Sequence, residues 1–225
     1  MSAPVRLWPM RKSTFREYLE SILIAAILAL FIRTFVFQAF KIPTGSMEPN
    51  LLVGDHIVVN KFMFGAGGDG SWLLPMRPIE RGDVVVFRAP EQPDEDFIKR
   101  VVAVGGDKIE IVDGVVQVND EVVDEPYAHH SSGFGSRRDY GPFHVPDGHY
   151  FCLGDNRDNS RDSRYWGTVP RHLVKGRAVV VYWSYDAPPF GWHGGSVTQG
   201  WADFARSLPG YLTETRWGRT FTMIR

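Results

Sequence analysis

The sequence has a single cysteine, Cys152, so the chain cannot form an internal disulfide or a paired-cysteine metal site. It also lacks an excess of either charge, because 25 Lys and Arg residues stand against 26 Asp and Glu residues. Nucleic-acid binding needs a clustered basic surface, and this balance does not predict one. The seven histidines are scattered without an H-E-x-x-H pattern. We therefore expect no metal, no cofactor and no nucleic-acid partner, and we interpret Cys152 as a buried small apolar residue.

Long apolar stretches are scarce, with one exception near the N-terminus. Residues 22–32 (ILIAAILALFI) are apolar or small without interruption, and a mostly apolar stretch follows Arg33 and continues to Phe40. Four basic residues precede this run: Arg6, Arg11, Lys12 and Arg16. A membrane span needs about 20 residues. The window from Tyr18 to Phe37 supplies that number if Arg33 lies near the outer interface.

A cleaved secretory signal has a similar basic start and apolar core, but residues 38–41 (QAFK) contain no A-x-A-like cleavage site. We therefore predict an uncleaved anchor. The basic residues before the apolar run favour a cytoplasmic N-terminus. The predicted parts are a cytoplasmic basic tail over residues 1–17, a transmembrane anchor over 18–40, and an extracytoplasmic domain over 41–225 on the outer (periplasmic) face of the plasma (inner) membrane.

Beyond Leu51, short runs rich in β-branched residues alternate with turn residues, which is typical of an antiparallel sheet or barrel. The predicted strands are residues 56–59, 83–87, 97–104, 108–112, 115–118, 149–153 and 177–183. Asp113-Gly114 favours a tight hairpin turn between two of them, because both residue types tolerate positive φ. Asn119-Asp120 indicates another turn. The expected fold class is mostly β, with an antiparallel β-sheet or barrel domain behind one N-terminal transmembrane helix.

Two other segments are rich in apolar residues. Phe62, Phe64 and residues 72–74 surround a glycine-rich loop and favour an exposed edge that dips into the outer leaflet, with core packing as the alternative. Residues 201–208 have apolar side chains at helical spacing and favour a short helix packed against the sheet.

One turn directly after the apolar run combines a hydroxyl residue with rigid neighbours. Residues 43–49 (PTGSMEP) place Ser46 between two prolines, which fix φ, and beside Gly45, which permits conformations that other residues avoid. The segment is therefore expected to be a rigid irregular loop, which suits a nucleophile. Taken alone, such a pattern is more often a simple turn after an anchor.

A serine hydroxyl becomes a good nucleophile only when a base removes its proton, and Lys99 is the best candidate for that base. Within residues 96–103 (DFIKRVVA), strand alternation places Lys99 on one face with Phe97, Val101 and Ala103. Burial on this apolar face would lower the pKa of the lysine and leave a neutral amine near neutral pH. A lysine that reaches solvent from an edge strand is the commoner arrangement, and the pattern leaves this alternative open.

A third stretch, residues 154–167 (GDNRDNSRDSRYWG), is too rich in charged and hydrogen-bonding side chains for a strand interior. It is interpreted as a structured polar loop, which either is a solvated turn or orients a catalytic amine.

Together, these segments resemble the bacterial type I signal peptidases, the membrane-anchored Ser/Lys proteases that remove signal peptides from exported proteins. The resemblance covers the anchor and most of the outer domain, in residues 42–51 (IPTGSMEPNL), 54–62 (GDHIVVNKF), 81–87 (RGDVVVF), 97–107 (FIKRVVAVGGD) and 154–170 (GDNRDNSRDSRYWGTVP). It implies a mostly β catalytic domain of the signal-peptidase type.

Matched residue by residue, the resemblance implies Ser46 as the nucleophile and Lys99 as the general base, with no histidine in the mechanism. It also implies an oxyanion hole built from the Ser46 backbone N–H and the Thr44 hydroxyl. Many relatives have serine at the position of Thr44, and threonine keeps the hydroxyl.

The resemblance also implies supporting and substrate-binding residues. Ser160 aligns with a hydroxyl that hydrogen-bonds the lysine amine. Asp162, with Arg100 and Arg164 as partners, would brace the polar loop. Six residues fall where family members line shallow apolar pockets for the substrate residues one and three before the scissile bond. They are Phe40, Ile42, Met47, Ile57, Val86 and Ile98.

The implied function is that of a membrane-anchored serine endopeptidase that cleaves the signal peptides of exported preproteins after A-x-A-like sites, at the surface of a lipid bilayer. The bound segment would add to the cleft as an extended strand. The alternatives are a related Ser/Lys peptidase that processes one dedicated partner, and an inactive anchored scaffold. The presence of both Ser46 and Lys99 disfavours the scaffold.

Overall fold

The computed structural model describes residues 14–61, 77–130, 137–186, 210 and 213–224. The predicted apolar edge at residues 72–74, the predicted short helix at 201–208 and most of the basic tail lie outside these ranges. The chain divides into two compact units, Met1–Val36 and Phe37–Arg225.

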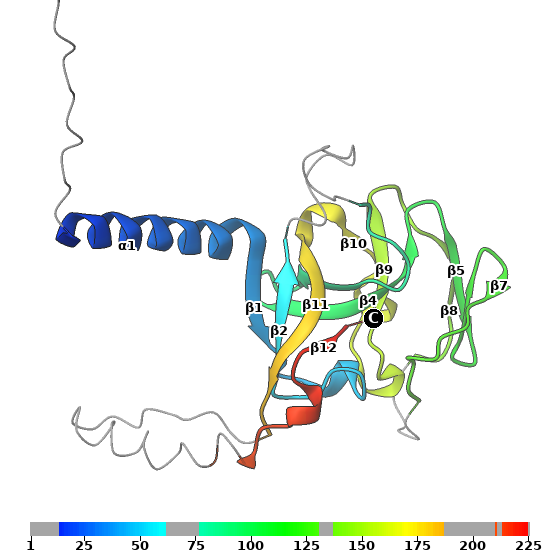
Figure 1. Ribbon diagram of the computed structural model, residues 1–225. Helices are drawn as coiled ribbons and strands as arrows, with labels where there is room; N and C mark the ends of the chain where they lie inside the picture. Colours follow the sequence, from blue (N-terminus) through cyan, green and yellow to red (C-terminus); the bar gives the residue numbers. More distant parts are fainter. Residues whose placement is uncertain (1–13, 62–76, 131–136, 187–209, 211–212, 225) are drawn as a thin grey trace, which may run out of the picture. The chain divides into compact units, whose positions relative to one another are not determined.

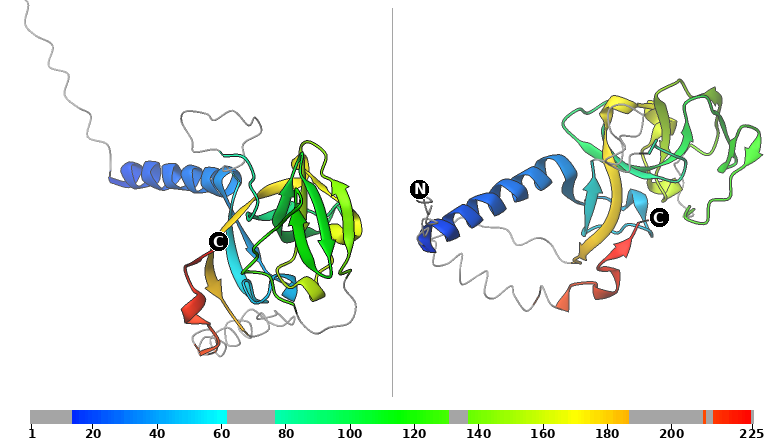
Figure 2. Two further views of the ribbon diagram at one scale, coloured as in Figure 1. Left: turned by 90° about the vertical axis from the view of Figure 1, so that its right-hand side faces the viewer. Right: turned by 45° about the horizontal axis from the view of Figure 1, so that its top comes forward.

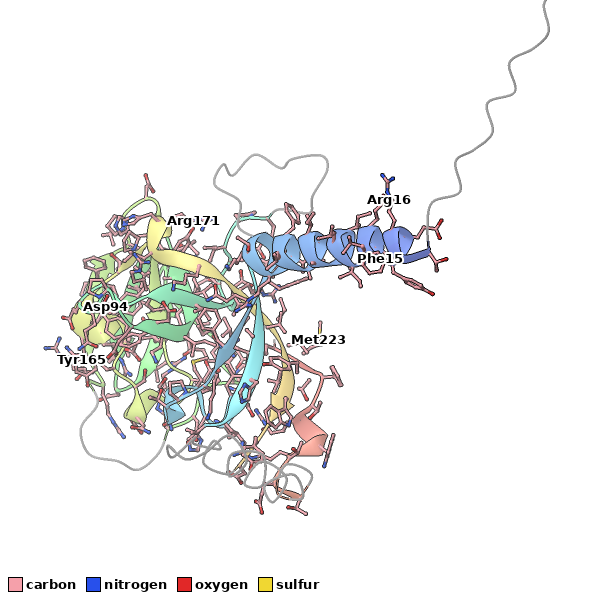
Figure 3. The ribbon with its side chains drawn as sticks, turned by 90° about the vertical axis from the view of Figure 1, so that its left-hand side faces the viewer. Phe15, Arg16, Asp94, Tyr165, Arg171 and Met223 are labelled. Carbon is pink, nitrogen blue, oxygen red and sulfur yellow. The ribbon has the colours of Figure 1, made fainter. Side chains whose placement is uncertain are left out.

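The described part of the first unit is helix α1 (Thr14–Phe31), continued by the π-helical turn η1 (Ile32–Val36). None of the residues of α1 is buried, and side chains such as those of Phe15 and Arg16 extend outward from the helix in Figure 3. Among the described residues, no helix combines the length and the apolar character that crossing a membrane requires.

Strand β1 (Phe37–Lys41) begins the second unit, so residues 37–40, which are predicted to belong to the anchor, lie in a strand. It pairs antiparallel with β2 (Asp55–Asn60), so that Phe40 lies opposite Ile57. The prediction of one helix over residues 18–40 is therefore wrong for residues 37–40. Hydropathy alone could not reveal the pairing with β2, because apolar residues suit a half-buried strand as well as a membrane span.

An eight-stranded antiparallel sheet forms most of the second unit, in the order β1-β2-β11-β3-β4-β9-β10, with β12 paired to β11 (Figure 1). Its other strands are β3 (Val84–Arg88), β4 (Asp96–Val104), β9 (His149–Leu153), β10 (Val169–Pro170), β11 (Val174–Ser184) and β12 (Thr222–Met223). The short helices between strands are η2 (Gly45–Met47), η4 (Arg157–Asn159), α2 (Ser163–Trp166), η5 (Arg171–Leu173) and η6 (Trp217–Arg219).

A second, four-stranded sheet has the order β7-β6-β5-β8 and is drawn in green in Figure 2. Its strands are β5 (Lys108–Val112), β6 (Val115–Val118), β7 (Glu121–Val122) and β8 (Tyr140–His144). Asp113 and Gly114 have φ values of 50° and 83°, and Asn119 and Asp120 have 55° and 68°. Both predicted turns are confirmed, and the mostly β fold class is confirmed with them.

Three apolar clusters fill the second unit among the described residues, and one of them lies under the serine turn. Burial alternates along β2, where Asp55, Ile57 and Val59 are buried and their neighbours are half-buried. Such alternation is expected when one face of a strand packs on the core. Strands β3 and β4 lie between others in the sheet and are buried over most of their length. Cys152 in β9 is fully buried, as predicted.

The last described segment returns to the large sheet. Strand β12 pairs with Val180 and Val181 of β11, and the two strands lie side by side in both views of Figure 2. Just before β12, Arg219 donates to the buried carboxylate of Asp55 at 2.6 Å and to the carbonyl oxygen of Asn50 at 2.8 Å. These bonds connect the last described segment to Asp55, the first residue of β2, and to Asn50 in the turn before it.

Candidate active site

Ser46 lies in the short helix η2, on a turn that backbone hydrogen bonds close at both ends. Ile42 and Gly54 are joined to residues across the turn, because the Ile42 N–H donates to the Asp55 oxygen at 2.8 Å and the Gly54 N–H to the Ile42 oxygen at 3.0 Å. The Leu51 N–H donates to the Met47 oxygen at 2.9 Å. Ser46 itself is 7% exposed. The turn is closed by backbone hydrogen bonds and most of the serine is shielded from water, but residues 45–47 form a short 3-10 helix where the sequence predicts an irregular loop.

Lys99 of β4 meets this serine, with Nζ donating a hydrogen bond to Ser46 Oγ at 2.5 Å. The lysine is 4% exposed, so the alternative in which it reaches solvent is excluded. Burial lowers the pKa of Lys99 from its usual 10.5 to about 8, although the negative charge of Asp162 acts in the opposite direction. A substantial fraction of the amine is therefore neutral in mildly alkaline solution.

Three apolar residues are predicted to share a face of β4 with Lys99, and two of them do. Phe97 and Val101 pack in one cluster, and the Phe97 ring lies 5.8 Å from Nζ. Ala103 belongs instead to another cluster with Val102, because the pairing between β4 and β9 shifts register between Val101 and Ala103. A bulge of this kind interrupts the alternation on which the prediction relied.

Asp162 forms an ion pair with Arg164, one of the two partners that the resemblance implies for it. The Arg164 guanidinium donates to Asp162 Oδ1 at 2.8 Å and to Oδ2 at 2.9 Å, and both residues are buried. Asp162 also accepts from the Gly154 N–H at 3.1 Å. Arg164 reaches further, to the Arg157 carbonyl at 2.6 Å. The carboxylate thus joins the two ends of the loop.

The prediction for Arg100 needs a correction, because its ion pair is with Asp155. Arg100 Nε and Nη2 donate to the two carboxylate oxygens of Asp155 at 2.8 and 2.7 Å, and both side chains are buried. The guanidinium also lies 4.1 Å from the centre of the Tyr127 ring. Arg100 follows Lys99 in a strand, so its side chain points to the opposite face. That alternation was a signal that Arg100 needs a counter-charge of its own.

The prediction for Ser160 also needs a correction. Its Oγ is buried and makes no hydrogen bond within the described part of the chain, so the expected bond to Lys99 is not formed. The hydroxyl lies against Gly154, where an added Cβ would come within 2.3 Å of it. The close approach of the loop to that glycine sets the position of the hydroxyl.

The remaining predicted residues surround the serine turn. Thr44 is exposed and stands at the N-cap of η2, but its side chain forms no cap hydrogen bond. The buried apolar cluster under the turn contains five of the six predicted pocket residues, and the half-buried Phe40 packs against it. The five are Ile42, Met47, Ile57, Val86 and Ile98.

One edge of β4 next to Lys99 is open in the described part of the chain. Strand β3 pairs with one edge from Asp96 to Arg100, whereas β9 pairs with the other edge only from Arg100 onward. The backbone of residues 96–99 therefore has an edge to which an extended segment can add.

Comparison with known proteins identifies similar sequences over most of this region. The sequence model of the family described as "Signal peptidase, peptidase S26" matches residues 15–183. A probable signal peptidase I-2 from Synechocystis sp. is 38% identical over 177 residues, which cover 76% of this chain and 75% of the relative. Signal peptidase I from Aquifex aeolicus is 34% identical, covering 77% and 86% of the two chains. Signal peptidase I from Pseudomonas aeruginosa is 35% identical, covering 76% and 74%.

Proposed function

The chain belongs to the peptidase S26 family of signal peptidases, and from that membership we propose that Ser46 and Lys99 are the catalytic dyad with which it removes signal peptides from exported proteins. The observation that carries the assignment is the buried hydrogen bond between Lys99 Nζ and Ser46 Oγ. A serine and a desolvated amine in direct contact can begin acyl transfer, because the amine can take the hydroxyl proton.

In the first half of the reaction, neutral Lys99 accepts the Ser46 proton while Oγ bonds to the scissile carbonyl carbon and the carbonyl electrons move to its oxygen. The Ser46 N–H and the Thr44 hydroxyl would donate to this oxyanion. When the carbon–nitrogen bond breaks, the Lys99 ammonium returns its proton to the leaving amine. In the second half, Lys99 takes a proton from the water that attacks the acyl-enzyme carbonyl carbon. The bond between this carbon and Ser46 Oγ then breaks, the product acid leaves, and the Lys99 ammonium returns its proton to Oγ.

The substrate segment would bind as an extended strand on the open edge of residues 96–99. Its side chains would then alternate between the apolar cluster under the serine turn and solvent. The small residues of an A-x-A-like site suit this arrangement, because the cluster is already packed and leaves little room for bulk. We therefore expect cleavage after such sites.

We also propose that the apolar N-terminal segment that contains residues 22–32 anchors the enzyme in the plasma (inner) membrane by a single pass, with the N-terminus cytoplasmic and residues 41–225 on the outer face, although no described helix alone has the length and apolar character of a span. Ile22, Leu23 and Ile24 are 65%, 53% and 66% exposed. Consecutive helix residues point about 100° apart, so an apolar surface surrounds the helix and suits an apolar environment. The protein should stay in the membrane pellet after an alkaline carbonate wash. Ile24→Asp with Ile27→Asp should release it, and Val112→Asp with Val115→Asp in the second sheet should not.

The dyad is tested by cleavage of a purified preprotein with an A-x-A site. Ser46→Ala, Lys99→Ala and the double variant should each lower kcat/KM by more than about 10³-fold, to a similar residual rate, because either change disables the same step. Lys108→Ala, in the second sheet, should cleave normally. Near-normal turnover by Lys99→Ala would refute the assignment of the base.

A further inference from the structure

Asn156, in the polar loop, contacts the backbone on both sides of Ser46. Its side-chain Nδ2 donates to the Gly45 carbonyl oxygen at 3.2 Å, and its backbone N–H donates to the Ser46 carbonyl oxygen at 3.1 Å. Asn156 is 7% exposed. One residue from a distant part of the sequence thus holds the two carbonyl groups that flank the serine nitrogen.

These contacts do not reflect a role of the side chain in its own loop. Asn156 occupies the N-cap of η4, where an asparagine side chain commonly caps the helix, but it forms no cap hydrogen bond there. Its Oδ1 is buried and has no hydrogen-bond partner within the described ranges. The carbonyl of Gly45 can only accept, so the amide nitrogen must face it. The side chain is therefore committed to the serine turn.

The loop that carries Asn156 is itself fixed in place. Asn156 forms a parallel bridge with His129, whose N–H donates to the Asp155 oxygen at 2.7 Å and whose oxygen accepts from the Arg157 N–H at 2.9 Å. Gly154 allows the loop to come close to the serine, because a Cβ added there would lie 2.5 Å from the Ser46 carbonyl oxygen. The position of the Asn156 amide is therefore determined by rigid neighbours.

The Gly45 carbonyl and the Ser46 N–H belong to the same planar peptide unit. A donor bound to the carbonyl fixes the direction in which the N–H points, and it also polarises the amide and strengthens the N–H as a donor. The direction of an oxyanion-hole donor matters because catalysis depends on its alignment with the oxygen that becomes negative.

We infer that Asn156 is a positioning residue of the oxyanion hole, which aims the Ser46 N–H by holding the Gly45 carbonyl. This inference rests on the proposed function and adds to it a residue that touches neither the substrate nor Lys99. It predicts that removal of the side-chain donor weakens binding of the tetrahedral state and leaves binding of the ground state unchanged.

The test compares Asn156→Ala with Asn159→Ala, a matched change at an exposed residue three positions later. Asn156→Ala should lower kcat about 10- to 100-fold with little change in KM. A peptide aldehyde ending in A-x-A forms a hemiacetal with Ser46 Oγ, and its inhibition constant should rise by a similar factor. The affinity for the matching product peptide, a carboxylate that forms no such bond, should stay unchanged. Asn156→Asp, which sets a carboxylate against the Gly45 oxygen, should lose at least as much.

Three results from kinetics and binding would overturn the inference: normal kcat in Asn156→Ala, an equal loss of affinity for the aldehyde and the product peptide, or a displaced pH profile of kcat/KM. The last would mean that the change had disturbed Lys99. A readout that needs no substrate is the ¹⁵N resonance of the Ser46 amide in the full chain. It should move upfield in Asn156→Ala and not in Asn159→Ala, and an unmoved resonance would also overturn the inference. Failure of the proposed function would instead appear as absent cleavage by the unmodified protein.

Discussion

Lys99 and Arg100 are adjacent basic residues of β4, and their surroundings differ. Lys99 and Arg100 are 4% and 2% exposed, so both are removed from water. On its face, Arg100 has both oxygens of Asp155 and an aromatic ring. On the other face, the hydrogen bonds of the described residues give Lys99 only the Ser46 hydroxyl. A buried cation with a counter-ion stays charged, whereas a buried amine without one tends to lose its proton. The difference between the faces separates a structural cation from the residue that we propose as the base.

The largest effect on stability is expected from removing Asp155, the counter-ion of Arg100. Asp155→Ala should lower the free energy of unfolding by about 3–5 kcal/mol, because it leaves the Arg100 guanidinium buried without its carboxylate. Denaturant unfolding of the detergent-solubilised protein would measure the change. Glu91→Ala breaks an exposed pair with Arg161 and should cost under about 1 kcal/mol. Equal effects of the two changes would mean that burial of the pair is energetically unimportant.

The free energy of unfolding should change in the opposite direction at Lys99, which has no counter-ion among its hydrogen-bond partners in the described residues. The folded-state pKa of Lys99, about 8, lies below its usual 10.5, so between these values the unfolded chain binds a proton that the folded protein does not. Stability should therefore rise with pH across this window, and below it the lysine should cost about 3 kcal/mol.

Lys99→Met removes the proposed base, so it should abolish cleavage. It also removes the cost of the buried ammonium, so it should raise the free energy of unfolding at pH 7. The gain should shrink to nothing above about pH 10.5, where the lysine is neutral in both states. The control is Lys175→Met, at a half-exposed lysine of β11, which should not raise the free energy of unfolding at pH 7 because this lysine pairs with Asp96. A Lys99→Met protein that is destabilised at pH 7 would mean that the amine is not desolvated.

A smaller effect on stability is expected at Gly154, where the polar loop packs against the serine turn. Gly154→Ala would bring a methyl group within 2.5 Å of the Ser46 carbonyl and 2.3 Å of Ser160 Oγ. It should cost about 1–3 kcal/mol by overpacking, and it should also lower kcat because the turn must shift. Gly82→Ala meets open space but has positive φ, so it should cost stability without lowering kcat. Unchanged kcat in Gly154→Ala would show that the loop can move away without cost to catalysis.

The surroundings of Lys99 and Arg100 differ in how far they could be predicted from the sequence. The Lys99 face is visible from the sequence because Phe97 and Val101 lie two residues away on the same strand. The partner of Arg100 lies 55 positions away, and no local pattern connects it to Asp155. The hydroxyl of Ser160 was misjudged for a related reason, because its position depends on how closely the loop approaches Gly154. Local periodicity reports the face of a strand and does not report what packs against that face.

Three strands that were not predicted, β1, β8 and β12, each escape sequence patterns for a physical reason. Strand β1 is apolar enough to merge with the run before it, and only its pairing with β2 distinguishes it. Strand β8 contains Gly141 and Pro142, two residue types that are disfavoured in strands. Strand β12 has two residues and exists through its pairing with β11. In contrast, the turns at Asp113 and Asn119 were predictable because positive φ is a local requirement.

The central claim is that Lys99 acts as a base because burial lowers its pKa, and the pH profile of kcat/KM tests it most directly. A base must be unprotonated in the free enzyme, so kcat/KM should rise through an acid limb near pH 8. Phe97→Ser should admit water beside Nζ, raise the lysine pKa and move this limb to higher pH. Phe143→Ser, the same change in a different cluster, should leave the limb in place. A limb that does not move in Phe97→Ser, or that moves to lower pH, would contradict the claim.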